Sequence, residues 1–307
     1  MQRRTIDYII LSLKGIAMGA ADAVPGVSGG TIAFISGIYE ELITTISNIN
    51  FSLWTTLKNQ GFSTFWKQLN GAFLVALLTG IIISFVSFMR LAKYLIENHP
   101  VLIWSFFFGL IVASIYFVGK QITKWHLGAL VALALGAFTA YYITTLPSMV
   151  SNDNPWFLVL AGAVAICAMI LPGISGSFIL VILGAYKTLS DALHDFDFKR
   201  IGLFVLGAVV GLLSFSRVLK WLFKHYHNTT LALLTGFIFG SLNKIWPWKR
   251  VLTWRMNSHN QKVPFLEESI SPFNYQGDNQ FYMALALMFI GFLTIIILER
   301  LGSTKTA

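Results

Sequence analysis

The sequence predicts an all-α integral membrane protein made of two inverted repeats, each a re-entrant helical hairpin followed by three transmembrane helices. Three observations support this fold class: a strongly apolar composition, long apolar runs and a duplicated Pro-Gly break. Of the 307 residues, 56% are hydrophobic and only 11% are charged, and the mean hydropathy is +0.70. Soluble domains carry about 25% charged residues. The composition therefore argues against a large soluble helical core and for a single transmembrane domain over residues 1–307.

Six apolar runs are expected to cross the membrane together with their flanking residues. A helix needs about 20 residues to span the hydrocarbon core, and the runs approach this length. Several runs contain small residues every four positions, such as Gly207 and Gly211, which would let the helices pack closely in lipid. The six runs cover residues 71–89, 101–118, 127–146, 201–215, 231–245 and 281–298.

Two further apolar segments are each interrupted by a Pro-Gly pair, at Pro25-Gly26 and at Pro172-Gly173. Proline removes a backbone donor and clashes with a continuing helix, and glycine adds freedom at the break. Each pair of short arms is therefore predicted to form a re-entrant hairpin, covered by protein or lining a water-filled cavity. A kinked full span is the alternative, because membrane helices tolerate proline.

The two breaks are copies of one motif. The first reads PGVSGGT from Pro25 and the second reads PGISGSF from Pro172, at an offset of 147 residues. A second block matches at an offset of 127 residues, where SFMR ending at Arg90 faces SFSR ending at Arg217. Two matching blocks in the same order indicate an internal duplication.

Repeat one is predicted to cover residues 5–146 and repeat two residues 155–300. The 20-residue difference between the two offsets is interpreted as a longer loop at residues 50–68 in the first half. Because each repeat would cross the membrane three times, the second copy must enter it in the opposite orientation. Such inverted repeats are typical of secondary transporters.

Loop charges predict the orientation of this plan. The chain start and the turn at residues 118–126 are basic, whereas the loop at residues 147–155 contains no Lys or Arg. The positive-inside rule then places the N- and C-termini in the cytoplasm and the uncharged loop outside. The long loop at residues 241–280 would also lie outside, despite its five basic residues up to Lys262.

The hairpin tips are the candidate substrate-binding site. Ser28 and Ser175 are predicted N-caps of the helices that follow, and the neighbouring glycines permit close approach to the backbone. Helix N-termini carry unpaired donors and partial positive charge, so two tips near the membrane midplane would suit an anion such as a phosphate group. The alternative is that these residues only build tight turns. The candidate residues of the tips are Pro25, Gly26, Ser28, Gly29, Gly30, Thr31, Pro172, Gly173, Ser175, Gly176 and Ser177.

Three charged residues complete the candidate site. Asp22 precedes the first break by three residues, and a carboxylate at membrane depth is costly, so it is a candidate for substrate binding and for coupling to protons or another ion. Its alternative role is to brace the amides of the tip. Arg90 and Arg217 each end a long apolar run. They either bind the phosphate at the two entrances or anchor the helices at the membrane surface.

The net charge of +9 would suggest nucleic acid if the protein were soluble. The basic residues lie mostly in short loops and at segment ends, so anionic membrane lipids are the expected partners and nucleic acid is not. Cys167 is the only cysteine, and the six histidines form no ligand cluster in the sequence. No catalytic residue, metal or cofactor is therefore predicted, and the oligomeric state stays open.

The motif GAADAVPGVSGGT from Gly19, with LPGISG from Leu171, resembles that of the bacterial PopT-type polyprenyl-phosphate transporters, formerly a domain-of-unknown-function membrane family. The resemblance covers nearly the whole chain. It implies a multi-pass protein of the bacterial plasma (inner) membrane that flips undecaprenyl phosphate from the outer to the inner leaflet, which recycles the carrier lipid for cell-wall synthesis. Ser177 and Phe178 depart from the Gly-Thr of the first copy, which puts the equivalence of the two hairpins in doubt.

An enzyme is the rival class, because the first motif also resembles the Pro-Gly-x-Ser-Arg-Ser loop of undecaprenyl pyrophosphate phosphatases. That hydrolase needs an arginine after the serine and a Glu-x-x-x-Glu box. Here Gly29 and Gly176 stand at the arginine position, and no two glutamates have that spacing. Without a general base or a phosphate-clamping arginine, hydrolysis is not expected. A secondary transporter of a small anion shares the architecture and is the second alternative.

Overall fold

The computed structural model describes residues 3–22, 28–146, 154–256 and 262–303. Within these ranges the chain forms thirteen α-helices, one pair of strands and a short 3-10 helix. The helices of the first half are α1 (Thr5–Asp22), α2 (Gly29–Ile35), α3 (Tyr39–Ser47), α4 (Phe51–Gln68), α5 (Gly71–Asn98), α6 (Pro100–Lys120) and α7 (Leu127–Thr145). The elements of the second half are α8 (Pro155–Ile170), α9 (Gly176–Ile182), α10 (Ala185–His194), α11 (Phe198–His225), α12 (His227–Ser241), β1 (Lys249–Met256), β2 (Lys262–Ser269), η1 (Pro272–Asn274) and α13 (Phe281–Ser303).

Each of the six apolar runs corresponds to one helix, α5, α6, α7, α11, α12 or α13, although the runs at residues 127–146 and 231–245 extend past the ends of α7 and α12. In the described residues, α6, α7 and α11 are each long and apolar enough to cross a membrane. The number rises to five if two helix pairs that bend sharply at a short break each count as one span. The chain is therefore a helical, multi-pass membrane protein, although α12 with 15 residues is shorter than the expected crossing helix.

Both Pro-Gly breaks separate two helices, α1 from α2 and α8 from α9. Gly173 has a φ of 85°, which strongly favours glycine. The second arm of each hairpin is itself interrupted after seven residues, at Gly37 and Gly184, whose φ angles are 72° and 69°. The apolar segment after each Pro-Gly break therefore forms two short helices instead of one. The bend between α9 and α10 is 109°.

Small residues let helices of the same half approach closely. A methyl group at Gly15 of α1 would lie 2.3 Å from the carbonyl oxygen of Leu77 in α5. A methyl group at Gly162 of α8 would lie 2.3 Å from the carbonyl oxygen of Phe204 in α11. Gly162 and Phe204 are the repeat partners of Gly15 and Leu77, at the offsets of 147 and 127 residues. The same backbone contact therefore occurs in both halves, as packing through small residues in lipid requires.

The remaining long helices pair between the halves, α6 with α13 and α12 with α7. A methyl group at Gly109 of α6 would lie 1.8 Å from the carbonyl oxygen of Met288 in α13. A methyl group at Gly236 of α12 would lie 2.2 Å from the carbonyl oxygen of Leu133 in α7. Gly236 is the repeat partner of Gly109. Long helices of one half therefore pack against long helices of the other, so the two halves form one packed body.

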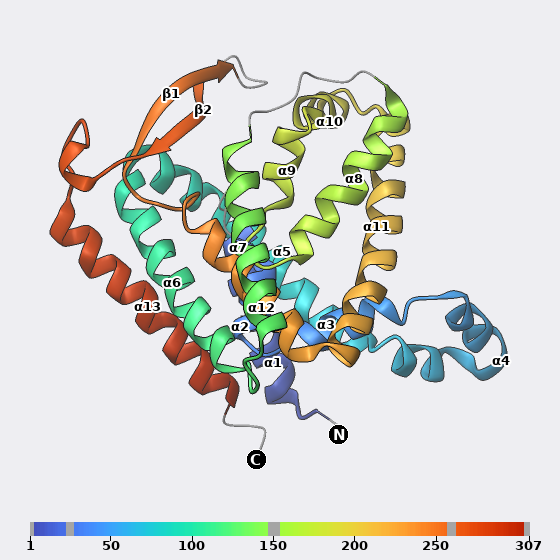
Figure 1. The fold of residues 1–307 in the computed structure, drawn as a ribbon. Coiled ribbons are helices and arrows are strands. Elements are labelled where there is room, and N and C mark those ends of the chain that lie inside the picture. The colour runs from blue at the N-terminus through green and yellow to red at the C-terminus, as the bar shows by residue number, and fades with distance from the viewer. Residues whose placement is uncertain (1–2, 23–27, 147–153, 257–261, 304–307) are drawn as a thin grey trace.

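Figure 1 shows two opposite ends of the molecule. The start of α1, the end of α13 and the turn between α6 and α7 lie at one end, here called the terminal side. The strands β1 and β2 and helix α10 lie at the other end, here called the strand side. Helix α1 begins on the terminal side and α8 begins on the strand side, so the first arms of the two hairpins enter the body from opposite ends (Figure 1).

Two segments differ from what the sequence predicts. Residues 50–68 were expected to form a loop, but α4 occupies this segment, with a kink at Gly61 (φ 81°) and exposed Phe51 and Trp54. It projects from the body in Figure 1. The strands β1 and β2 pair antiparallel, from Lys249 opposite Ser269 to Met256 opposite Lys262. A strictly all-α fold is therefore wrong for the loop before α13, because two segments of this loop satisfy their backbone groups by pairing with each other.

Candidate functional site

The structure brings the two hairpin tips into direct contact. The backbone N–H of Gly173 donates a hydrogen bond to the hydroxyl of Thr31 at 3.0 Å. The hydroxyl of Ser28 lies 3.3 Å from the carbonyl oxygen of Met169 and 3.4 Å from that of Leu171, to which it donates. Segments about 140 residues apart in the sequence therefore form one polar centre inside a predominantly apolar body.

Two of the described residues of the first tip are fully buried. Ser28 and Thr31 are 1% and 0% exposed. Ser28 caps α2, as the sequence predicts, because its hydroxyl accepts a hydrogen bond from Gly30 N at 3.1 Å. Pro25 and Gly26 lie outside the described residues.

Asp22 supplies the second acceptor of the first tip. Its Oδ1 atom accepts a hydrogen bond from Gly29 N at 2.7 Å. A methyl group at Gly29 would lie 2.3 Å from Asp22 Oδ2, so glycine is required for this approach. The carboxylate therefore braces the amides of the tip, which is the alternative role that the sequence left open. It also occupies the position at the start of α2 where an external anion would otherwise bind.

The second tip is more open and differs in its hydrogen bonds. Ser175 stands at the N-cap position of α9, but its hydroxyl does not cap the helix. It pairs instead with the hydroxyl of Ser177 at 2.9 Å. The predicted N-cap role is therefore wrong for Ser175, because the second serine, absent from the first copy, is a competing partner. Ser177 is exposed and Ser175 is partly exposed, whereas Pro172 and Gly176 are buried.

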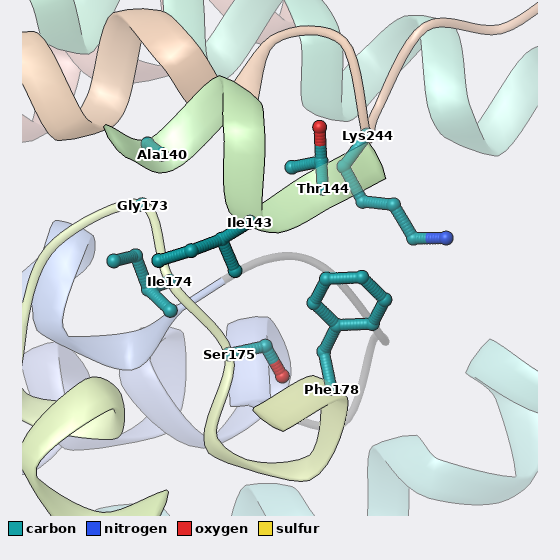
Figure 2. A pocket seen from close by; sticks show the side chains of 8 residues that line it. All are labelled: Ala140, Ile143, Thr144, Gly173, Ile174, Ser175, Phe178 and Lys244. Carbon is teal, nitrogen blue, oxygen red and sulfur yellow. The ribbon is translucent and has the colours of Figure 1, made fainter. Parts of the chain in front are cut away.

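A pocket opens beside the second tip (Figure 2). Ser175 and Phe178 of the tip line one wall, and Thr144 of α7 lines another. Lys244, in the turn after α12, completes the lining, and its Nζ atom lies 4.8 Å from the centroid of the Phe178 ring. The other lining residues are Ala140, Ile143, Gly173 and Ile174. A hydroxyl group and an ammonium group therefore share one small, largely apolar pocket.

Lys244 belongs to no motif that the sequence reveals. It is one of the basic residues of the 241–280 loop, which the positive-inside rule could not easily place outside. The conflict between these basic residues and the positive-inside rule is the one feature of the sequence that could have pointed to Lys244. A basic residue that conflicts with the charge rule is a candidate for a functional role, but only the fold shows that Lys244 reaches the second tip.

Lys244 belongs to an ion-pair cluster with the strands. Glu267 Oε2 lies 3.5 Å from Lys244 Nζ and 3.6 Å from Lys249 Nζ. Lys249 Nζ also lies 4.8 Å from the ring centroid of Trp104. Burial lowers the pKa of Lys249 to about 8 from its ordinary value of 10.5, although Glu267 opposes this shift. Two lysines therefore share one carboxylate next to the pocket.

Arg217 lies at the end of α3 rather than at a hairpin tip. Its NH2 group donates a hydrogen bond to the carbonyl oxygen of Ile49 at 3.0 Å, and Lys220 Nζ donates to Asn48 Oδ1 at 2.8 Å. These bonds attach α11 to the segment at the C-terminal end of α3. The side chain of Arg90 lies outside the described part of the structure.

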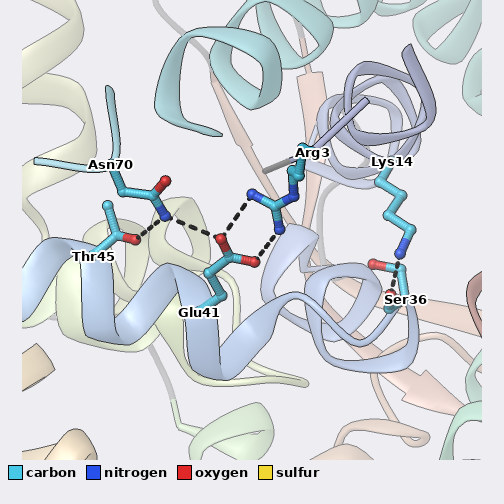
Figure 3. Close-up of polar contacts among 6 residues, drawn as sticks. All are labelled: Arg3, Lys14, Ser36, Glu41, Thr45 and Asn70. Carbon is cyan, nitrogen blue, oxygen red and sulfur yellow. Dashed lines mark hydrogen bonds and ion pairs between the residues drawn. The ribbon is translucent and has the colours of Figure 1, made fainter. Parts of the chain in front are cut away.

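Polar contacts also hold the first hairpin at its outer end (Figure 3). Arg3 NH1 donates to Glu41 Oε1 at 2.8 Å, and Asn70 Nδ2 donates to the same oxygen at 3.0 Å. Lys14 Nζ donates to the carbonyl oxygen of Ser36, just after α2, at 2.5 Å. The first hairpin is therefore fixed on the terminal side and buried at its tip, whereas the second has a pocket at its tip.

Known proteins resemble the chain over nearly its whole length. Residues 18–263 match the model of the family described as VCA0040-like, undecaprenyl phosphate translocase-like. A protein of Vibrio cholerae serotype O1 named "Polyprenyl-phosphate transporter" is 45% identical over 304 residues, which cover 98% of this chain and 99% of that protein. A protein of Staphylococcus aureus with the same name is 32% identical over 255 residues, which cover 76% of this chain and 85% of that protein. No solved structure matches the chain significantly.

These matches confirm the family resemblance found in the sequence motifs. Both relatives are named as transporters and not as hydrolases, so the chain is a transporter-family protein rather than an enzyme. Among the described residues, no three His, Cys, Asp or Glu side chains gather in a group that could hold a metal ion. The doubled Pro-Gly hairpin, the family match and the near full-length similarity lead to one conclusion: this protein belongs to the undecaprenyl phosphate translocase-like family of membrane transporters.

Proposed function

We propose that this protein moves undecaprenyl phosphate from the outer to the inner leaflet of the bacterial plasma membrane and so returns the carrier lipid to cell-wall synthesis. The observation that carries the proposal is the pocket at the second hairpin tip, which combines Ser175 with Lys244 beside the buried Ser28 and Thr31 of the first tip. The names of the two relatives supply the substrate class, polyprenyl phosphate.

A phosphate group in a medium of low dielectric constant needs several donors, because an unpaired charge there is expensive. The Ser175 and Ser177 hydroxyls and the Lys244 ammonium group are donors on the open side of the second tip. The polyprenyl chain stays in the bilayer during transfer, so only the headgroup needs a polar path. In this proposal the phosphate binds first at the second tip and then passes to Ser28 and Thr31 of the first tip.

Asp22 is the proposed coupling residue. Its carboxylate now accepts the Gly29 N–H bond, and it would repel a phosphate that approaches the first tip. A proton on Asp22 removes this repulsion and weakens the bond to Gly29, so the amide becomes free for the phosphate. Release of the proton restores the bond and expels the phosphate. This cycle makes transport depend on a proton gradient.

The proposed architecture is a pair of inverted repeats with both chain ends in the cytoplasm. It is supported by the backbone contacts that recur in both halves at Gly15 and Gly162, and by the opposite starting ends of α1 and α8. In this orientation the strand side faces out and the pocket is open toward the outer leaflet. Arg90 remains a proposed phosphate ligand at the opposite entrance, and Arg217 is proposed as an anchor because it is bonded to Ile49.

The test is reconstitution of the pure protein into liposomes that carry labelled undecaprenyl phosphate. An impermeant phosphatase added outside would report how much labelled lipid stays in the outer leaflet. We expect the protected fraction to equilibrate rapidly only with the protein present, and a neutral polyprenol not to be transported. Uptake of inorganic phosphate without lipid movement would identify a small-anion transporter. Steady phosphate release from undecaprenyl pyrophosphate, lost in Ser28→Ala, would identify a hydrolase.

A further inference from the structure

We propose that Lys244, Glu267 and Lys249 form an anion-exchange clamp on the strand side, in which the phosphate of the lipid headgroup displaces Glu267 from Lys244. This inference rests on the proposed function, because it assigns the residue that first captures the headgroup. It also gives a role to the two partly buried lysines and the glutamate that lie beside the pocket.

The charges of the Lys244, Lys249 and Glu267 side chains do not balance. The Lys244, Lys249 and Glu267 side chains are 25%, 10% and 24% exposed, so all three are largely removed from water. Glu267 bridges the two ammonium groups at 3.5 and 3.6 Å, distances longer than those of a direct charged hydrogen bond. The three groups together carry a net positive charge. A partly buried excess charge is costly and attracts a further anion.

Lys244 lies between the cluster and the pocket. Its Nζ atom lies 3.5 Å from Glu267 and 4.8 Å from the ring centroid of Phe178, which lines the pocket with Ser175. Figure 2 shows its side chain extended past the end of α7, near Thr144 and Phe178. Lys244 and Ser175 both line this pocket, and in Figure 2 the Phe178 ring lies between the ammonium group and the Ser175 hydroxyl. The apolar walls suit the first atoms of a polyprenyl chain.

The Glu267 carboxylate, which the phosphate would displace from Lys244, has a second partner in Lys249. Lys249 is the more buried lysine, with its Nζ bonded to the backbone carbonyl of Lys244 and covered by the Trp104 ring. When Lys244 turns to the phosphate, Lys249 keeps Glu267 paired. The exchange therefore leaves no buried carboxylate without a partner, which would otherwise be strongly unfavourable. One lysine can exchange its anion because the other does not move.

Hydrogen bonds hold the strands against the pocket wall. Asn243 Nδ2 donates to Thr144 Oγ1 at 3.2 Å, and Ser269 Oγ donates to Asn243 Oδ1 at 3.0 Å. Trp246 Nε1 donates to the carbonyl oxygen of Ile270 at 2.8 Å. These bonds fix the end of β2, two residues after Glu267, relative to α7. The connection between α6 and α7 spans only residues 121–126, so the strands occur in one half alone, and the clamp would serve one side of the membrane.

The test is the affinity of each purified variant for a short-chain polyprenyl phosphate in detergent, with the neutral polyprenol as the ligand control. Lys244→Met should weaken phosphate binding by about tenfold or more, the usual effect of losing a charged hydrogen-bond donor. Lys244→Arg should largely retain it. Glu267→Gln should strengthen binding, because the competing carboxylate is gone. A general folding defect cannot produce this increase.

The matched controls lie on the same strands. Arg250 and Glu268 form an exposed ion pair, with side chains 54% and 50% exposed, so Arg250→Met and Glu268→Gln repeat the charge changes away from the pocket. Both should leave the affinity unchanged. Equal affinities of Lys244→Met and Arg250→Met, or weaker binding in Glu267→Gln, would overturn the clamp. If the wild type transports the lipid in liposomes and Lys244→Met binds normally, the clamp alone is wrong. If the wild type moves no lipid, the proposed function is wrong.

Discussion

The backbone amide of Gly173 in the second hairpin donates a hydrogen bond to the hydroxyl of Thr31 in the first, at 3.0 Å. This bond joins the last residue of the first Pro-Gly motif to the glycine at the start of the second. Thr31 is completely buried, so its hydroxyl cannot be replaced by water without a rearrangement. The bond is therefore a direct test of whether the contact between the tips matters for stability and for transport.

Thr31→Val keeps the shape of the side chain and removes the acceptor for Gly173. We expect a loss of about 1–3 kcal/mol in the free energy of unfolding, the cost of an unsatisfied buried amide. Thermal unfolding in detergent measures it, and transport should fall as well. The exposed Thr55 gives the control, because Thr55→Val should be close to neutral. Equal stability of the two variants would contradict the role of the bond.

Ser28→Ala and Ser175→Ala should have different effects, although the two serines occupy equivalent positions in the repeats. Ser28 is buried and caps α2, so Ser28→Ala should lower stability by about 1 kcal/mol, as well as weaken phosphate binding. Ser175 lines the pocket and does not cap α9, so Ser175→Ala should weaken binding with little change in stability. The measurements are the unfolding temperature and the affinity for polyprenyl phosphate. Identical profiles for both variants would argue against the difference between the tips.

Asp22→Asn should abolish the dependence of transport on a pH gradient. The asparagine side-chain oxygen can still accept the Gly29 hydrogen bond, so the first tip should keep its structure. Lipid binding should stay measurable, because the pocket at the second tip is unchanged. Transport into liposomes with and without an imposed gradient tests this, with the exposed Asp278→Asn as the control. Gradient-driven transport that persists in Asp22→Asn would exclude Asp22 as the coupling group.

Single cysteines test the proposed orientation. Cys167 is the only native cysteine, so Cys167→Ser provides the background. An impermeant thiol reagent added to intact cells should label Thr253→Cys on β1 and Ser151→Cys in the uncharged loop. It should label Lys124→Cys, in the turn after α6, only after the cells are opened. Labelling of Lys124→Cys and protection of Thr253→Cys in intact cells would reverse the orientation.

Lys249 should make the stability of the protein depend on pH. Burial lowers its pKa to about 8 in the folded state from an ordinary value of 10.5. Between these two values the unfolded chain binds more protons than the folded one, so stability should rise as the pH increases through this range. Unfolding temperatures at pH 8 and pH 10 measure the change. The rise should be smaller in Lys249→Met and unchanged in the exposed Lys58→Met. Parallel curves for all three proteins would mean that Lys249 carries no such penalty.

Local patterns in the sequence were sufficient to predict much of the fold. Apolar runs located the long helices because a lipid-exposed helix must be apolar along its whole length. The Pro-Gly pairs located both hairpin breaks because the effect of proline on a helix is local. The duplicated motif also identified Ser28 as the cap of α2. Residues 50–68 were misassigned as a loop because α4 is too polar for a span and is amphipathic around a kink at Gly61.

The sequence by itself determined that this is a multi-pass membrane protein with two related halves and a polar break in each. The tertiary structure decided that the two tips touch, that Asp22 accepts a hydrogen bond from Gly29 at the first, and that the pocket lies at the second. It also brought Lys244 into the same pocket lining as Ser175, about 70 residues away in the sequence, and placed Glu267 between two lysines. Hydrophobic periodicity and helix breaks act over a few residues. Contacts between distant polar side chains depend on how whole helices pack, and no local pattern encodes them.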